Sequence, residues 1–132
     1  MDICILQLGT YGDMILTTPI ISLLKQRFPD SKIFFICGNR NHIVIRYHPS
    51  VYRILRWSKS PAALLKNIAW LRFHEFDYYI DPKDHYSFEG QMIAKIVRSK
   101  LKIGLNQKTF NFHISIQSEG ENINLHFTER AL

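Results

Sequence analysis

Short apolar runs of strand length alternate with segments of helical periodicity along this chain. Residues 3–8 and 32–37 are near-continuous apolar runs, which is typical of strands covered on both faces. Between them, apolar residues recur every three or four positions from Ile15 to Phe28, as on the buried face of a helix. Alternation at this spacing predicts right-handed crossovers and a parallel sheet. We therefore expect a Rossmann-like α/β fold, a parallel sheet with helices on both faces, in a single domain over residues 1–132.

Capping residues and prolines set the expected limits of the helices. Asp13 can cap the first helix and Pro29 closes it, while Pro19 is expected to kink the helix or break it after its first turn. Ser60 and Pro61 are typical of a second helix start. The apolar residues expected on the buried faces of the second helix and of one over 87–98 are Leu64, Leu65, Ile68, Leu71 and Phe73, then Phe88, Met92, Ile93, Ile96 and Val97. Other segments predict strands at 51–57, 76–81, 100–105 and 110–116, a weak helix at 41–47, and a helix from about Leu125.

The composition is that of an ordinary soluble globular chain, with 46% hydrophobic and 21% charged residues. No run is long and apolar enough to span a bilayer, and no basic segment precedes the first apolar run, so we expect no signal peptide and a cytoplasmic location. The net charge of +6 favours an anionic partner, such as nucleic acid, a phosphorylated sugar or an acidic membrane surface. Because no recognition-helix signature or aromatic-interleaved basic motif is present, nucleic acid is not expected.

Cysteine and basic residues have ordinary explanations. Cys4 and Cys37 lie inside apolar runs, where two buried thiols on neighbouring strands are expected rather than a disulfide. No Cys/His spacing resembles a metal site, so no metal and no bound cofactor are predicted. Arg98, Lys100 and Lys102 form a tight basic group that a solvated face also explains.

The loop Gly9–Asp13 is the strongest candidate for a functional site. It follows the first strand, and ligands of such sheets gather at the carboxyl ends of the strands. Gly9 and Gly12 allow a tight turn and the close approach of a ligand. The spacing G-x-x-G-D matches neither a dinucleotide fingerprint nor a P-loop. A carboxylate at this position indicates a general base for a hydroxyl, although helix capping by Asp13 explains the same residue.

The segment Leu8–Pro19 resembles the N-terminal motif of the heptosyltransferase-like glycosyltransferases, family nine. That motif is an apolar strand, G-x-x-G-D, apolar residues and T-x-P, followed by a helix that ends near Pro-Asp, as at Phe28–Asp30. Residues 75–81 (EFDYYID) are similar to the family's YDLVID strand, 102–105 (KIGL) to its RIG strand, and Leu125-His126 to a late motif. The resemblance therefore extends over nearly the whole chain.

This resemblance implies one half of a GT-B fold and an inverting transfer without a metal, from a nucleotide sugar, typically ADP-heptose, to lipopolysaccharide core or a similar acidic glycolipid. Asp13 would be the general base. The residues expected to shape or bind the acceptor site are Gly9, Thr10, Tyr11, Gly12, Thr17, Thr18 and Lys83. Thr17 and Thr18 are equally explained by hydrogen bonds to the helix backbone. Asp81, Lys83 and Asp84 should reach the rim that carries Asp13, or form a solvated turn after Pro82.

The family's donor-binding domain follows the segment that this chain resembles, so we expect that domain to be absent and the chain to be inactive alone. A nucleotide-sugar donor would be a partner only with a second domain supplied. Peripheral contact with the inner membrane face and self-association through the uncovered surface are also expected. A non-enzymatic Rossmann-like module that binds an anion or a protein, or a truncated remnant, remains the alternative.

Overall fold

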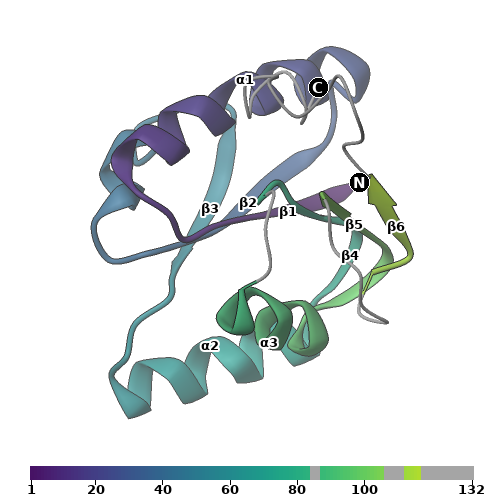
Figure 1. The fold of residues 1–132 in the computed structure, drawn as a ribbon. Helices are drawn as coiled ribbons and strands as arrows, with labels where there is room; N and C mark the ends of the chain where they lie inside the picture. Colours follow the sequence, from purple (N-terminus) through teal and green to yellow (C-terminus); the bar gives the residue numbers. More distant parts are fainter. Residues whose placement is uncertain (84–86, 106–111, 117–132) are drawn as a thin grey trace, which may run out of the picture.

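The computed structural model describes residues 1–83, 87–105 and 112–116, which build one parallel sheet. Its strand order is β3-β2-β1-β4-β5-β6 (Figure 1). The strands are β1 (Asp2–Gln7), β2 (Lys32–Cys37), β3 (Val51–Arg56), β4 (Glu75–Asp81), β5 (Arg98–Leu105) and β6 (Ile114–Ile116). The order reverses between β1 and β4, which creates the switch point where doubly wound sheets bind ligands. The predicted Rossmann-like parallel sheet is confirmed.

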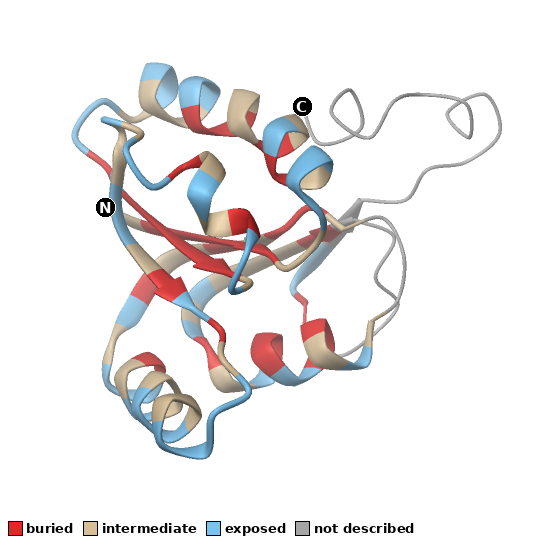
Figure 2. Ribbon diagram, turned by 90° about the vertical axis from the view of Figure 1, so that its left-hand side faces the viewer, coloured by how far each residue is buried: buried red, intermediate tan, exposed pale blue. Residues whose placement is uncertain are grey.

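Helices cover both faces of the sheet, as predicted. Helix α1 (Tyr11–Arg27) lies on one face with the 3-10 helix η1 (Asn41–Val44), and α2 (Pro61–Phe73) and α3 (Phe88–Ile96) lie on the other (Figure 1). Each face has its own core. Met14, Ile20 and Ile21 of α1 pack with side chains of one face, whereas Leu71 of α2 and Ile93 of α3 pack with the other. The central strands between these layers are almost wholly buried (Figure 2).

Helix α1 differs from the expectation at two points. Thr10, not Asp13, is the N-cap residue, and Asp13 is the third helical residue. Pro19 does not break the helix, which runs from Tyr11 to Arg27 with the proline inside it. A proline at position 19 has no N–H for the carbonyl of Ile15, but the Thr18 hydroxyl donates to that carbonyl at 2.6 Å. A local hydrogen bond thus replaces the one that proline removes.

Four apolar side chains that were expected to face the core instead face outward. Leu65 and Phe73 of α2 are 69% and 88% exposed, and Phe88 and Met92 of α3 are 74% and 38% exposed. Both helices carry apolar residues on more than one side, so periodicity alone does not identify the buried face. The other residues expected on these faces are confirmed: Leu71, Ile93 and Val97 are buried in the core, and Leu64, Ile68 and Ile96 pack against it.

The remaining expected strands and helices agree with the structure to within a few residues, where it describes them. Cys4 and Cys37 are buried free thiols on adjacent strands, and burial raises the pKa of Cys37 to about 12. The weak helix near 41–47 is the short η1. The strand expected at 110–116 is described only as β6, while the late Leu125-His126 motif and the helix expected there lie outside the described residues. Within the described part of the chain, no helix has the length and apolarity needed to cross a membrane.

Candidate functional site

The candidate site lies at the carboxyl edge of the sheet, where the strand order reverses between β1 and β4. The chain leaves β1 into the loop Gly9–Thr10, which leads directly into α1, and it leaves β4 toward Lys83. A small cleft joins the two strand ends, lined by Leu6, Gln7, Leu8, Asp81, Lys83, Ser87 and Gly90. The structure therefore brings Asp81 and Lys83 to the end of β1, from which the loop with Asp13 continues. Asp84 lies outside the described residues.

Asp13 is held by a capping box at the start of α1. Its Oδ2 accepts hydrogen bonds from the backbone N–H of Thr10 at 2.9 Å and from the Thr10 hydroxyl at 3.1 Å. In return, the backbone N–H of Asp13 donates to Oγ1 of Thr10 at 3.2 Å. No residue in the described ranges donates a hydrogen bond to Oδ1 of Asp13. The carboxylate is therefore oriented through Oδ2, while Oδ1 takes no part in the capping box.

The two glycines of the loop serve different purposes. A β-carbon on Gly9 would overlap Oδ2 of Asp13 and come within 2.9 Å of its Cβ and Cγ. Glycine at position 9 is therefore required for the position of the carboxylate. A β-carbon on Gly12 would meet only Oγ1 of Thr10, at an ordinary 3.6 Å. Gly12 is exposed beside exposed Tyr11, so its missing side chain leaves space outside the loop rather than inside the fold.

Gln7 and Asn41 bind the backbone of this loop through hydrogen bonds, and neither was among the predicted site residues. Gln7 is 5% exposed, and its Oε1 accepts from the Gly9 N–H at 3.0 Å. Asn41 is 2% exposed, and its Nδ2 donates to the carbonyls of Gln7 and Gly9, each at 2.9 Å. Its Oδ1 accepts from the Gly38 N–H, also at 2.9 Å. The loop after β1 is thereby fixed to the loop after β2.

The two threonines of the T-x-P segment bind the helix itself. The Thr17 side chain is buried, donates to the Asp13 carbonyl at 2.8 Å and accepts from Nε2 of Gln7 at 2.8 Å. Thr18 donates to the Ile15 carbonyl. These contacts correspond to the backbone-bonding alternative, and Thr17 has no exposed surface with which to touch an acceptor. Both threonines position the first turns of α1, including the residue that carries the carboxylate.

Asp81 is the second carboxylate at this edge. It is 3% exposed, and its Oδ1 accepts from the Lys83 N–H at 3.1 Å. A β-carbon on Gly90, in the first turn of α3, would come within 3.3 Å of Oδ2 of Asp81. The carboxylate therefore approaches the positive end of the helix dipole, which favours an anion at that point. In the parts of the chain that the structure describes, no cluster of His, Cys, Asp or Glu has the arrangement of a metal site.

Comparisons with known proteins give a consistent set of relatives. No protein-family model matches the chain. Lipopolysaccharide heptosyltransferase 3 of Escherichia coli strain K12 is 32% identical over 95 residues, which are 67% of this chain and 26% of that protein. A second Escherichia coli lipopolysaccharide heptosyltransferase 3 is 25% identical over 100 residues, 70% of this chain and 29% of that protein. The chain thus spans little more than a quarter of these relatives.

Solved structures show the same fold. Escherichia coli heptosyltransferase WaaC with ADP superposes with a TM-score of 0.78 over 99% of this chain and 45% of that one, at 17% identity. A glycosyl transferase family 9 structure from Veillonella parvula gives a TM-score of 0.73 over 98% of this chain and 38% of that one, at 18% identity. At such identities the superpositions show the fold alone, and that fold is one part of a larger protein in both cases.

Proposed function

Because this chain is a relative of the heptosyltransferases of glycosyltransferase family nine, we propose that it is the acceptor-binding part of an inverting, metal-independent sugar transferase. The donor would be a nucleotide sugar and the acceptor a lipopolysaccharide core or a similar acidic glycolipid. The observation that carries this proposal is the geometry of Asp13, whose Oδ2 is fixed by Thr10 at the switch point of the sheet while Oδ1 is left to a ligand.

In the proposed reaction, a hydroxyl of the acceptor donates a hydrogen bond to Oδ1 of Asp13. The proton passes to that oxygen as the acceptor oxygen attacks the anomeric carbon of the donor sugar. The bond between this carbon and the nucleotide diphosphate breaks, and the configuration at the carbon inverts. Asp13 would then act as the general base, a role that requires hydrogen-bond reach to the reacting hydroxyl. Gly9 supports the role by leaving room for the carboxylate.

Cations at the same edge of the sheet support an acidic acceptor. Arg40 follows β2, Arg56 ends β3 and Lys59 follows it, and all three are exposed. Lys83 lies on the opposite side of the candidate site, in the cleft beside Gln7 and Leu8. Phosphate or carboxylate groups of a glycolipid core would find partners on both sides of the loop. Exposed Thr10, Tyr11 and Gly12 would provide the central contact surface.

The proposed protein needs a second, donor-binding domain for transfer, in the manner of a GT-B enzyme. We further propose peripheral contact with the inner face of the cytoplasmic membrane, where a glycolipid acceptor would be encountered. We also propose that the chain self-associates, because it leaves apolar surface exposed.

A second function is favoured by the completeness of the capping box. Thr10 and Asp13 form both hydrogen bonds that define a capping box, so helix capping alone explains an aspartate at position 13. Under this alternative the chain is a Rossmann-like module that binds an anion or a protein at the same edge and transfers nothing. Removal of the Asp13 charge would abolish transfer if Asp13 is the general base. It would affect only the start of α1 if Asp13 is a capping residue.

The test is a chimera in which residues 1–132 replace the matching segment of Escherichia coli lipopolysaccharide heptosyltransferase 3. We expect transfer in the chimera and a loss of roughly 10²- to 10⁴-fold in Asp13→Asn, because the general base is removed. Asp30→Asn, which removes an exposed carboxylate after α1, is the matched control and should leave the rate unchanged. EDTA should not change the rate of the unmodified chimera.

Thermal unfolding of the same variants shows whether each is folded, so that the transfer rates of folded proteins can be compared. Asparagine at position 13 can still accept the hydrogen bonds of Thr10, so a folded Asp13→Asn chimera without transfer supports the base role. An Asp13→Asn chimera that transfers as fast as its parent would show that Asp13 only caps α1. A chimera that binds the acceptor but never transfers would favour the non-enzymatic module.

A further inference from the structure

Helix α2 presents an exposed stripe that is apolar and cationic. Its exposed residues after Pro61 recur at helical spacing and are Ala62, Leu65, Lys66, Ala69, Arg72 and Phe73. Leu65 and Phe73 are 69% and 88% exposed, so this is not the edge of a buried face. The thirteen residues of α2 (PAALLKNIAWLRF) include no acidic side chain. The helix therefore offers solvent two large apolar groups between positive charges.

Helix α3 continues this surface. Phe88, Met92 and Lys95 are exposed at positions i, i+4 and i+7, and they share one side of the helix. Figures 1 and 2 show α2 and α3 side by side on the same face of the sheet, on the far side from α1. The surface made by Leu65, Lys66, Arg72, Phe73, Phe88, Met92 and Lys95 is called the α2–α3 face below.

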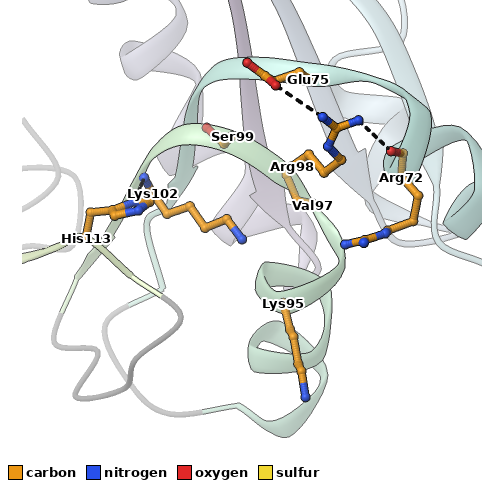
Figure 3. Close-up of a pocket in the computed structure, with 8 residues that line it drawn as sticks. All are labelled: Arg72, Glu75, Lys95, Val97, Arg98, Ser99, Lys102 and His113. Carbon is orange, nitrogen blue, oxygen red and sulfur yellow. Dashed lines mark hydrogen bonds and ion pairs between the residues drawn. The ribbon is translucent and has the colours of Figure 1, made fainter.

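A basic pocket lies at the carboxyl ends of the two helices. Its volume is about 420 Å³, and its charged and titratable lining residues are Arg72, Glu75, Lys95, Arg98, Lys102 and His113 (Figure 3). Arg98 pairs with Glu75 at 3.3 Å, which leaves an excess of positive charge in the pocket. The Lys102 ammonium donates to the Ala94 carbonyl, and burial together with nearby Arg72 lowers the pKa of Lys102.

The positive charge of the pocket and the cationic and apolar side chains of the α2–α3 face are complementary to an anionic bilayer surface. Arg72 belongs to both, and exposed Phe73 directly follows it. Aromatic and aliphatic side chains among lysine and arginine are typical of helices that lie in a membrane interface. Each such cation near a negative leaflet contributes about 1 kcal/mol to binding. One exposed apolar residue would carry no meaning, but four on one side of adjacent helices do.

We propose that the α2–α3 face docks on the surface of an anionic lipid bilayer. Leu65, Phe73 and Phe88 would enter the interfacial region, while Lys66, Arg72 and Lys95 would meet lipid phosphates. This inference rests on the proposed function in one respect: a glycolipid acceptor would be met at a bilayer surface. Helix α2 begins after β3, at the sheet edge that carries the Gly9–Asp13 loop, so a docked α2 would bring that loop near the lipid surface.

The test is sedimentation of the chain with vesicles of phosphatidylcholine, with and without phosphatidylglycerol. We expect binding to the anionic vesicles only, weakened by salt. Loss of two cations at about 1 kcal/mol each predicts a partition at least roughly 30-fold weaker for Lys66→Glu/Lys95→Glu, and repulsion of the two added carboxylates weakens it further. Phe73→Ser should weaken it roughly tenfold, because a benzyl group no longer leaves water. All of these positions are exposed, so circular dichroism should show an unchanged fold.

The matched control is Arg27→Glu/Arg46→Glu, which changes the net charge equally but lies outside the α2–α3 face and involves exposed residues. Retained binding in this control supports the proposal. An equal loss in both double variants would show that net charge alone drives binding and would overturn the proposal. Absence of binding to anionic vesicles, with or without self-association of the chain, would overturn it too. None of these readouts requires sugar transfer, so the docking surface can fail while the transferase proposal stands, and the reverse.

Discussion

Gly9 and Asp13 are in such close contact that a β-carbon on Gly9 would occupy the space of the Asp13 carboxylate. The carboxylate reaches this position because its Oδ2 accepts two hydrogen bonds from Thr10. The G-x-x-G-D segment is therefore a steric unit as well as a loop. The missing side chain of Gly9 leaves room for the Asp13 carboxylate, and that carboxylate accepts hydrogen bonds at the start of α1.

The first prediction compares the two glycines of this loop. Gly9→Ala should lower the free energy of unfolding by about 1–3 kcal/mol, because the added methyl displaces Asp13 and its capping bonds. Gly12→Ala has room for its methyl and should raise stability by up to about 1 kcal/mol, because alanine is the better helix former. Urea unfolding of both variants measures the difference. Equal effects of the two substitutions would contradict the steric role of Gly9.

The second prediction concerns the proline inside α1. Thr18→Val should cost about 1 kcal/mol, because it leaves the Ile15 carbonyl without the hydroxyl that serves it. In a Pro19→Ala background, alanine restores a backbone N–H at position 19 that can donate to that carbonyl, so the same Thr18→Val change should cost close to nothing. A double-mutant cycle by thermal unfolding measures this coupling. Additive effects would show that the Thr18 hydroxyl does not compensate for the proline.

The third prediction tests the buried amide under the loop. Asn41→Ala removes three hydrogen bonds, from a buried carbonyl of Gln7 and from part-buried backbone groups of Gly9 and Gly38. We expect a loss of about 3 kcal/mol in the free energy of unfolding. Asn39→Ala, an exposed neighbour, should change stability by less than about 0.5 kcal/mol. Hydrogen exchange of the Gly9 N–H should become faster in Asn41→Ala only, and unchanged exchange would contradict the role of Asn41.

The fourth prediction is a pH dependence at Asp77. Its carboxylate accepts from the Asp2 N–H at 2.8 Å and pairs with Lys100 at 3.2 Å, and these contacts lower the pKa of Asp77 below its ordinary 3.8. A lowered folded-state pKa stabilises the fold above about 3.8, and this contribution is lost as the pH falls through the lower folded value.

Asp77→Asn should therefore be less stable than the parent at pH 7, by no more than about 1 kcal/mol for so exposed a pair. The difference should shrink as the pH falls below about 4. Denaturant unfolding over this pH range measures it. A difference between parent and variant that is independent of pH would exclude ionisation of Asp77 as the cause.

Much of the fold follows from local patterns in the sequence. The apolar runs at 3–8 and 32–37 correspond to β1 and β2, because strands covered on both faces need apolar residues at nearly every position. The Ser-Pro pair at 60–61 correctly marks the start of α2. The loop after the first strand was located from its glycines and its place in the alternation. Such features depend on neighbours in the chain, so the sequence displays them directly.

The supports of the candidate site do not follow from local patterns. Asn41 binds Gly9 across 32 positions of sequence, and nothing near either residue signals that contact. Gln7 carried a weak signal, as an amide inside an apolar strand, but its partner Thr17 lies in the next element. The cap of α1 was misassigned because Thr10 and Asp13 can each cap a helix, and only the backbone path of the loop distinguishes them.

By itself, the sequence determined the parallel α/β architecture and the place of the Gly9–Asp13 loop at the end of a buried strand. Both depend on periodicity and backbone preference, which act between near neighbours. The tertiary structure alone decided which apolar residues of α2 and α3 face water, and which oxygen of Asp13 accepts the hydrogen bonds of Thr10. Those outcomes depend on how each helix meets the sheet, and that packing sums contacts between residues far apart in the chain.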